Sequence, residues 1–242
     1  MTSESTATPA QQIAAGYATT GQALELGSVV IDGTVDPAAQ VRIPLAMMNR
    51  HGLVAGATGT GKTKTLQVIA EQLSAAGVPV VMADIKGDLS GLSRPGEASE
   101  RTVQRAKDTG DDNWAGAPFP VEFLSLGTGG VGVPVRATIS AFGPILLSKV
   151  LGLNATQEST LGLIFHWADQ QGLPLLDLKD LRSVITYLTS DEGKEQLKTI
   201  GGVSPQTAGV ILRALVNLEA DGGDTFFGEP AIDPADLLRV DS

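Results

Sequence analysis

The 242-residue chain contains no cysteine and only two histidines, and aromatic residues make up 4% of it. Without cysteine the chain has no disulfide framework, no thiolate chemistry and no zinc site built on cysteine. With two histidines, and no paired carboxylates at a useful spacing, we expect no cluster of metal-ligating side chains. The sequence therefore argues against functions that depend on disulfides, a reactive thiolate or a cluster of metal-ligating side chains.

Long apolar runs and an N-terminal positive charge are also missing. No uninterrupted apolar stretch approaches the roughly 18 residues that a membrane-spanning helix needs. The first basic residue is Arg42, so the N-terminal segment lacks the charge of a secretory signal or a transit peptide. We therefore expect a cytoplasmic protein with no membrane segment.

Positive charge is scarce throughout, because 17 Lys and Arg oppose 27 Asp and Glu and leave a formal net charge of −10. Such a balance argues against a general nucleic-acid-binding surface. The region from Lys86 to Lys107 is mildly positive, and its Arg101 and Arg105 share a helical face. We interpret this arginine pair as a solvated face rather than as a contact with a phosphate backbone.

What the chain does contain is a glycine-rich run with the letters GATGTGKT, which fits the Walker A pattern G-x-x-x-x-G-K-[ST]. Its glycines allow backbone dihedrals that a side chain would forbid, so successive N–H groups can face one anion. The run leads into a helix whose positive end faces the same phosphates. The predicted nucleotide-binding residues are Gly56, Ala57, Thr58, Gly59, Thr60, Gly61, Lys62 and Thr63.

The context of this loop supports a site for ATP with Mg²⁺. Residues 53–55 form a short apolar run, as a buried strand does, directly before the loop. After the loop, apolar residues at the spacing i, i+3, i+4, i+7 predict a helix with one buried face, made of Leu66, Ile69, Ala70 and Leu73. We expect Lys62 to reach the β- and γ-phosphates and the Thr63 hydroxyl to ligate Mg²⁺.

Asp84 ends the next apolar run, Val80–Asp84, which completes a β-α-β unit with the loop helix. Open α/β sheets place their ligands at this carboxyl edge. Asp84 either orders Mg²⁺ or a water near the γ-phosphate, or caps the following turn through backbone N–H groups. Both roles stay open, and Lys62 and Asp84 are the candidate catalytic residues.

The predicted fold class is α/β, a P-loop NTPase with a parallel sheet, a helical insertion and a short β-rich N-terminal element. Four consecutive amphipathic patterns between residues 141 and 220 indicate the insertion. The predicted segments are a flexible tail (1–21), a β-element (22–48), the nucleotide-binding core (49–140), the helical insertion (141–220) and an acidic C-terminal segment (221–242).

One element that hydrolysis requires is not found. Many ATPases supply a carboxylate near Mg²⁺ from an apolar strand that ends in Asp-Glu, and no apolar run of this chain ends that way. Asp191-Glu192 follows a helical pattern instead. Two interpretations stay open: an ATPase, or a nucleotide-binding fragment that hydrolyses nothing and acts through a partner chain.

Two stretches, Arg50–Thr63 and Gly77–Gly91, closely resemble the HerA-like bacterial P-loop ATPases of the YjgR-like branch, relatives of the HerA–FtsK group of DNA translocases. The resemblance extends from about Leu24 to the end of the chain, through residues 143–148, 153–158, 176–181 and 222–230. It implies a RecA-like core with a helical insertion and, in the wider group, hexameric rings that move DNA.

The resemblance places Lys62 and Thr63 at the Walker A positions and Asp84 at the acidic end of the second strand. It also implies that the chain corresponds to the N-terminal half of such a protein, with the Asp-Glu strand beyond Ser242. The function implied is an ATP-binding ATPase or DNA helicase-translocase that uses Mg²⁺, forms hexamers and acts on DNA by family analogy. A GTPase or small-molecule kinase is a weaker alternative, because Asp84–Gly87 fits D-x-x-G but no N-K-x-D motif follows.

Overall fold

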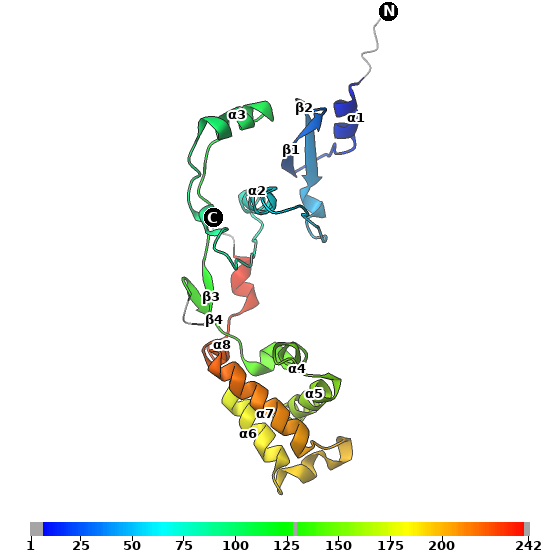
Figure 1. The fold of residues 1–242 in the computed structure, drawn as a ribbon, viewed down its shortest axis with the longest axis vertical. Helices are drawn as coiled ribbons and strands as arrows, with labels where there is room; N and C mark the ends of the chain where they lie inside the picture. The colour runs from blue at the N-terminus through cyan, green and yellow to red at the C-terminus, as the bar shows by residue number, and fades with distance from the viewer. Residues whose placement is uncertain (1–6, 128–129, 240–242) are drawn as a thin grey trace, which may run out of the picture. The chain divides into compact units, whose positions relative to one another are not determined.

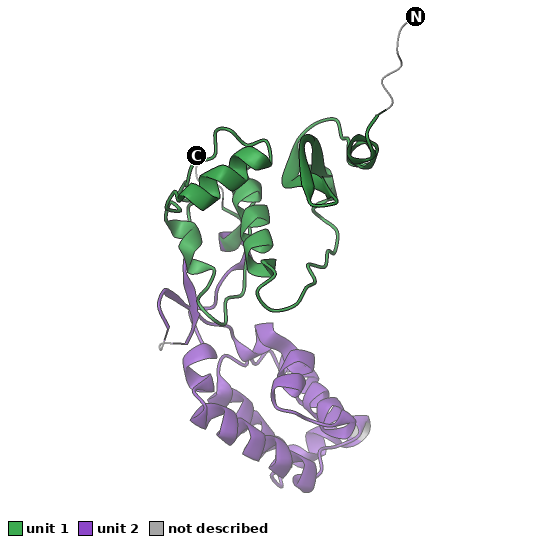
Figure 2. Cartoon of the chain, turned by 45° about the horizontal axis from the view of Figure 1, so that its top comes forward, with its two compact units in different colours: residues 1–121, 237–242 green, residues 122–236 purple. Residues whose placement is uncertain are grey.

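The computed structural model describes residues 7–127 and 130–239, which Figure 1 shows as a ribbon. The chain divides into unit 1, residues 1–121 with 237–242, and unit 2, residues 122–236 (Figure 2). These limits differ from the predicted boundaries at 140 and 220. No helix in the described ranges is long and apolar enough to cross a membrane.

Short strands and helices alternate in unit 1, whereas helices dominate unit 2. The elements are α1 (Pro9–Ala15), β1 (Ala23–Ile31), β2 (Thr34–Pro44), η1 (Leu45–Met47), α2 (Lys62–Ala75), η2 (Ser90–Ser93), α3 (Glu100–Asp108), β3 (Leu124–Leu126), β4 (Val133–Val135), α4 (Ile139–Val150), α5 (Ala155–Gln170), α6 (Leu178–Thr189), η3 (Gly193–Ile200), α7 (Pro205–Ala220), α8 (Gly223–Phe226) and η4 (Pro234–Leu238).

An antiparallel hairpin of β1 and β2 follows the N-terminal helix, which confirms the two strands predicted there. Asp32 and Gly33 connect the strands with φ angles of 49° and 80°, as the tight two-residue hairpin turn requires. Helix α1 packs its Ala10 against the hairpin in a small buried cluster. Residues 9–15 of the predicted tail are therefore helical, and residues 1–6 lie outside the described ranges.

The parallel sheet expected around the phosphate loop is not formed by the described residues. Neither of the runs 53–55 and 80–84 is a strand, and the side chains of Leu53 and Val81 are 89% and 69% exposed. A buried parallel strand needs ladder partners and apolar cover on both faces, and the described parts of the chain supply neither to these runs. Among the named strands, the short β3 and β4 pair in parallel. The structure is thus mixed α/β with small sheets, and the P-loop sheet stays a prediction.

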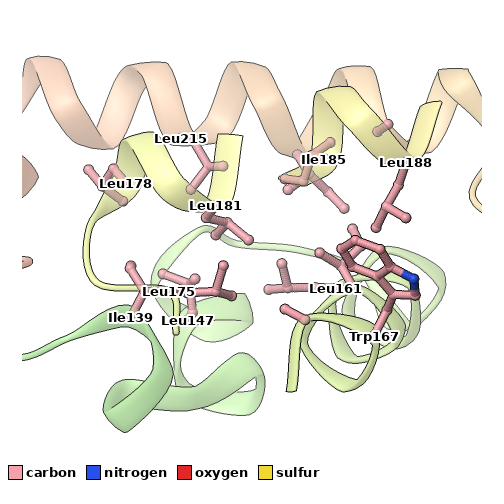
Figure 3. Close-up of a cluster of buried hydrophobic side chains, with 14 of the residues drawn as sticks. Ile139, Leu147, Leu161, Trp167, Leu175, Leu178, Leu181, Ile185, Leu188 and Leu215 are labelled. Carbon is pink, nitrogen blue, oxygen red and sulfur yellow. The ribbon is translucent and has the colours of Figure 1, made fainter. Parts of the chain in front are cut away.

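Unit 2 is built around the four helices α4 to α7, which confirms that residues 141–220 are largely helical. Their inward-facing side chains form one apolar core, seen in Figure 3. Leu161, Leu181 and Ile185 are 0% exposed within it. The i, i+3, i+4 spacing of α5, α6 and α7 therefore predicted the buried faces of these helices.

The apolar side chains of α4 are divided between the core and the solvent. Leu147 is 0% exposed, whereas Leu146 and Val150 are 57% and 54% exposed. A break at Gly143, with a φ of 78°, precedes this part of the helix.

Helix α5 begins at a capping box. The Asn154 side chain accepts a hydrogen bond from the Gln157 amide, and the Gln157 side chain accepts one from the Asn154 amide. Helix α7 begins with Ser204 as its cap and Pro205 in the first turn. Both helix starts are therefore fixed by residues within one turn.

Arg136, which directly follows β4, forms hydrogen bonds with residues near the C-terminal end of unit 2. Its guanidinium donates hydrogen bonds to the carbonyl oxygens of Glu229 at 2.7 Å and Phe227 at 2.9 Å. Phe227 also forms a parallel bridge with Ala137 and packs edge-on against Phe142. Part of the motif at residues 222–230 therefore has a structural role within unit 2.

Glu158, in the first turn of α5, joins this helix to α4. Its Oε2 accepts hydrogen bonds from Ser148 Oγ at 2.8 Å and Lys149 Nζ at 2.9 Å. The hydrogen bond from Lys149, followed by that from Ser148, holds the pKa of the Glu158 carboxyl below its ordinary value. A carboxyl with a lowered folded-state pKa stabilises the fold above its unfolded-state pKa, and this contribution is lost as the pH falls through the folded-state value.

We expect Glu158→Gln to lower the stability of unit 2 at neutral pH and to make it less sensitive to acid. The urea midpoint of the helical circular dichroism signal should fall less between about pH 6 and about pH 3 in this variant than in the unmodified chain. Glu192→Gln, at an exposed carboxylate of the same unit, is the matched control and should keep the original pH dependence. If the urea midpoint depends on pH in the same way in the unmodified chain and in Glu158→Gln, ionised Glu158 does not stabilise unit 2 as proposed.

Candidate phosphate-binding site

The glycine-rich loop runs in coil and turn conformation into α2, whose first residue is Lys62. Gly59 and Gly61 have φ angles of 82° and 94°, in the left-handed region where a side chain would be strained. At Gly56 a Cβ would lie 2.5 Å from Thr60 Oγ1, so a side chain at this position would require Thr60 to move. All three glycines of the motif therefore stand where this loop conformation needs them.

The Lys62 ammonium lies against the backbone of the loop. Its Nζ donates hydrogen bonds to the carbonyl oxygens of Gly56 at 2.8 Å and Ala57 at 2.7 Å. The Thr60 hydroxyl donates to the same Ala57 oxygen at 2.8 Å. Because charge-assisted bonds to phosphate are stronger than bonds to neutral carbonyls, an anion in the loop would compete for this ammonium.

Phosphate oxygens and Mg²⁺ both find suitable ligands in this short segment. Backbone N–H groups at the start of a 14-residue helix, a lysine ammonium and the Thr63 hydroxyl follow one another in the chain. This donor set fits ATP bound with Mg²⁺. The roles of residues 56–63 as its ligands remain a prediction.

Asp84 caps the turn that follows it. Its Oδ1 accepts hydrogen bonds from the amides of Lys86 at 3.2 Å and Gly87 at 2.7 Å, and its Oδ2 accepts one from Leu89 at 3.0 Å. The Leu89 bond is the largest influence on the Asp84 pKa, and together these amides lower it despite the opposing effect of desolvation. The capping role is thus present, and the carboxylate is kept ionised. A role toward Mg²⁺ or water remains a prediction.

Gln67, which the sequence patterns did not single out, holds the Asp84 turn against the loop helix. Its Nε2 donates to the carbonyl oxygen of Asp88 at 2.9 Å, and its Oε1 accepts from Lys64 Nζ at 2.8 Å. Gln67 is 7% exposed, whereas Leu66, predicted to be buried, is 42% exposed. The prediction for Leu66 is wrong, because the buried face of α2 includes the glutamine. The spacing of Gln67, Ala70 and Leu73 was the available signal.

We expect Gln67→Leu to loosen the turn, because the Asp88 carbonyl and the Lys64 ammonium both lose their partner. The free energy of unfolding should fall by about 1 kcal/mol, and the Gly87 and Leu89 amides should exchange with solvent several times faster. Hydrogen exchange measured by NMR reports both effects.

Gln72→Leu is the matched control, one turn further along α2. The Gln72 amide pairs with the N–H and C=O groups of Glu25, at 2.6 and 2.8 Å, and makes no bond to the Asp84 turn. Its replacement should leave exchange at Gly87 and Leu89 unchanged. Equal acceleration in both variants would show that Gln67 has no special role there.

Residues 31–242 match the model of the family described as helicase HerA-like C-terminal. The chain belongs to this family. Neither the comparison with curated proteins nor the comparison with solved structures gave a match. The resemblance to HerA-like proteins is thereby confirmed, and it relates this HerA-like chain to ATPases of the HerA and FtsK type.

The sequence also brought forward charged residues outside this loop. Arg101 and Arg105 are exposed on the short helix α3. Asp191-Glu192 lies between α6 and η3 of unit 2, where Asp191 pairs with Lys194 at 2.6 Å. In this HerA-like chain, Gln67 ties the turn that Asp84 caps to the phosphate-loop helix through the Asp88 carbonyl oxygen.

Proposed function

We propose that this HerA-like chain binds ATP with Mg²⁺ through residues 56–63, as part of an ATPase or DNA helicase-translocase. The observation that carries the proposal is the position of Lys62. Its ammonium lies 2.7–2.8 Å from two carbonyl oxygens of the loop, directly at the start of α2. Membership of the family supports the proposal that the phosphates bound by this loop belong to a nucleotide.

Each residue has a role that follows from its chemistry. The amides of the loop and of the first turn of α2 hold the phosphates, and Lys62 exchanges its two carbonyl partners for phosphate oxygens. Thr63 would hold Mg²⁺ through its hydroxyl. Asp84, ionised and fixed on its turn, orients a water toward the site. A bound Mg²⁺ would neutralise the charge that develops on the phosphoryl group during transfer.

A non-hydrolysing nucleotide-binding function is the second candidate. Both carboxylate oxygens of Asp84 already accept backbone hydrogen bonds, and no apolar run ends in Asp-Glu. Such a chain would hold the nucleotide and depend on a partner for turnover. Hexamer formation and action on DNA are proposed from the family alone.

Calorimetric titration of the chain with Mg²⁺-ATP and with Mg²⁺-GTP tests the proposal. We expect saturable ATP binding with a dissociation constant in the roughly 1 μM–1 mM range usual for enzymes and their substrates, and weaker binding of GTP. No heat with ATP, or tighter binding of GTP, would contradict it. Phosphate release from bound ATP then separates the ATPase from the non-hydrolysing alternative.

The DNA part of the proposal has its own test. If the chain contacts the phosphate backbone, the logarithm of its association constant for duplex DNA falls linearly with the logarithm of the salt concentration. Fluorescence anisotropy with a labelled duplex at several salt concentrations measures this slope. An affinity that does not change with salt, or no affinity, would remove DNA from the proposed function.

A further inference from the structure

Unit 2 has a pocket of about 600 Å³ that is lined by the start of α4, by α5 and by the turn after α5. The residues that α5 contributes include Gly162, Phe165, His166 and Asp169. These four stand at i, i+3, i+4 and i+7, so they share one face of the helix. The side chains of this face therefore project toward the pocket.

Another wall of the pocket is held in place by Ser140, in the first turn of α4, and Leu175. The Ser140 amide donates a hydrogen bond to the Leu175 carbonyl oxygen at 2.8 Å, and Ser140 Oγ accepts one from the Leu175 amide at 2.8 Å. Space remains beside Gly162, because no atom outside its own helical turns lies within 4 Å of the position that a Cβ would take. The pocket is therefore already formed, and its size is usual for a ligand site.

The charge of this pocket comes from Asp169, whose side chain is exposed. Its carboxylate has no ion pair and no hydrogen-bond donor among the described residues. Asp169 lies in the last turn of the 16-residue α5, where the helix carbonyl groups add a partial negative charge and no Lys or Arg offsets it. His166 completes the polar lining, and its neutral imidazole can accept a hydrogen bond. The pocket thus offers a negative charge with acceptors beside it.

These features favour an organic cation that carries a guanidinium group. An anion would be repelled, and a metal ion would find too few ligands, since no three His, Cys, Asp or Glu side chains of the described residues are grouped to hold one. Phe165 is partly buried against the core of unit 2 and also lines the pocket. A guanidinium group stacks on an aromatic ring and pairs with a carboxylate through two parallel N–H groups, whereas an ammonium lacks this planar fork.

The charge of the whole chain indicates where such a guanidinium comes from. A formal net charge of −10 attracts basic proteins and opposes the approach of a second copy. We propose that this pocket of unit 2 binds an arginine side chain of a basic partner protein. The guanidinium pairs with the Asp169 carboxylate and stacks on Phe165, and its aliphatic stem lies over Gly162. The phosphate loop belongs to unit 1, so the proposal does not depend on nucleotide binding.

NMR titration of the full chain without nucleotide tests the proposal with two matched probes. N-acetyl-arginine amide carries the guanidinium next to uncharged peptide groups, and N-acetyl-citrulline amide has nearly the same shape without the charge. The arginine probe should shift the backbone amide signals of Gly162, Asp169 and Gly172 saturably. The citrulline probe should bind at least about fivefold more weakly, because it cannot form the ion pair with Asp169.

Three variants locate the binding site. Asp169→Asn keeps the shape of the side chain and removes its charge, so it should bind the arginine probe about fivefold more weakly and no longer distinguish the two probes. Glu192→Gln removes the same charge from an exposed carboxylate of unit 2 outside the pocket, and it should change the affinity by less than about twofold. Gly162→Leu fills the open space and should abolish the shift, while α5 stays folded because leucine favours helix more than glycine does.

Four results would overturn the proposal. The first is the absence of a saturable shift with the arginine probe. The second is equal affinity of the unmodified chain for the two probes. The third is an equal loss of affinity in Asp169→Asn and Glu192→Gln, which would show that the net charge alone attracts the probe. The fourth is a shift of the same signals that follows the concentration of the chain without any probe, because the occupant would then be a second copy.

Discussion

Replacing Lys62 by alanine is expected to weaken Mg²⁺-ATP binding by about 100-fold, since two charge-assisted hydrogen bonds to phosphate are lost. Lys62 Nζ lies 2.8 and 2.7 Å from the carbonyl oxygens of Gly56 and Ala57. The Lys62 ammonium therefore lies at the loop before a nucleotide binds, and we expect it to donate hydrogen bonds directly to the bound phosphates. Calorimetric titration measures the loss.

The neighbouring lysine provides the control for this experiment. Lys64→Ala removes the same charge two residues further along α2, where the ammonium donates to Gln67 Oε1 at 2.8 Å. It should change ATP affinity by less than about threefold, because an exposed charge that makes no contact with the phosphates is screened by water and salt. An equal loss in the two variants would show that total charge, rather than the position of Lys62, governs binding. Undiminished binding by Lys62→Ala would show that ATP binds elsewhere.

The second large effect is expected in the core of unit 2. Leu181, on α6, is 0% exposed among the aliphatic side chains of Figure 3. Leu181→Ala should lower the free energy of unfolding of unit 2 by about 3 kcal/mol, because it removes buried methyl groups and leaves a cavity. Urea unfolding followed by Trp167 fluorescence, in the Trp114→Phe background, measures the change.

Leu146→Ala is the matched control for the same substitution in the same unit. Leu146 is 57% exposed on α4, so its truncation should change the free energy of unfolding by no more than about 0.5 kcal/mol. ATP affinity should be unchanged in both variants, since the phosphate loop and Asp84 belong to unit 1. A core substitution that abolishes ATP binding while unit 1 remains folded would contradict this independence.

The sequence predicted the helical unit well because its signals are local. The spacing of Leu181, Val184, Ile185 and Leu188 defines one face of α6 whatever that face packs against, and the core places it inward. Ser204 and Pro205 likewise start α7 through contacts within one turn. Where two faces competed, as with Leu146 and Leu147 on α4, the spacing alone could not choose between them.

The sheet was less predictable because its strands depend on partners elsewhere in the chain. The runs 53–55 and 80–84 have the composition of buried strands, yet a strand exists only where another strand pairs with it. Gln67 was missed for a similar reason. The spacing of Gln67 with Ala70 and Leu73 was a signal of its burial, but the sequence does not reveal its partner, the Asp88 carbonyl. The glycine-rich loop was predictable because its letters encode backbone conformation directly, as the positive φ angles of Gly59 and Gly61 illustrate.

The most direct test of ATP binding at this loop is differential scanning calorimetry of the chain with and without Mg²⁺-ATP. A ligand that binds only the folded form raises the melting temperature of the part that holds it. We predict that ATP raises the melting temperature of unit 1, whose transition is the one that Leu181→Ala leaves unchanged. This rise should disappear in Lys62→Ala and persist in Lys64→Ala. No rise with ATP, or the same rise in Lys62→Ala, would contradict a nucleotide site at residues 56–63.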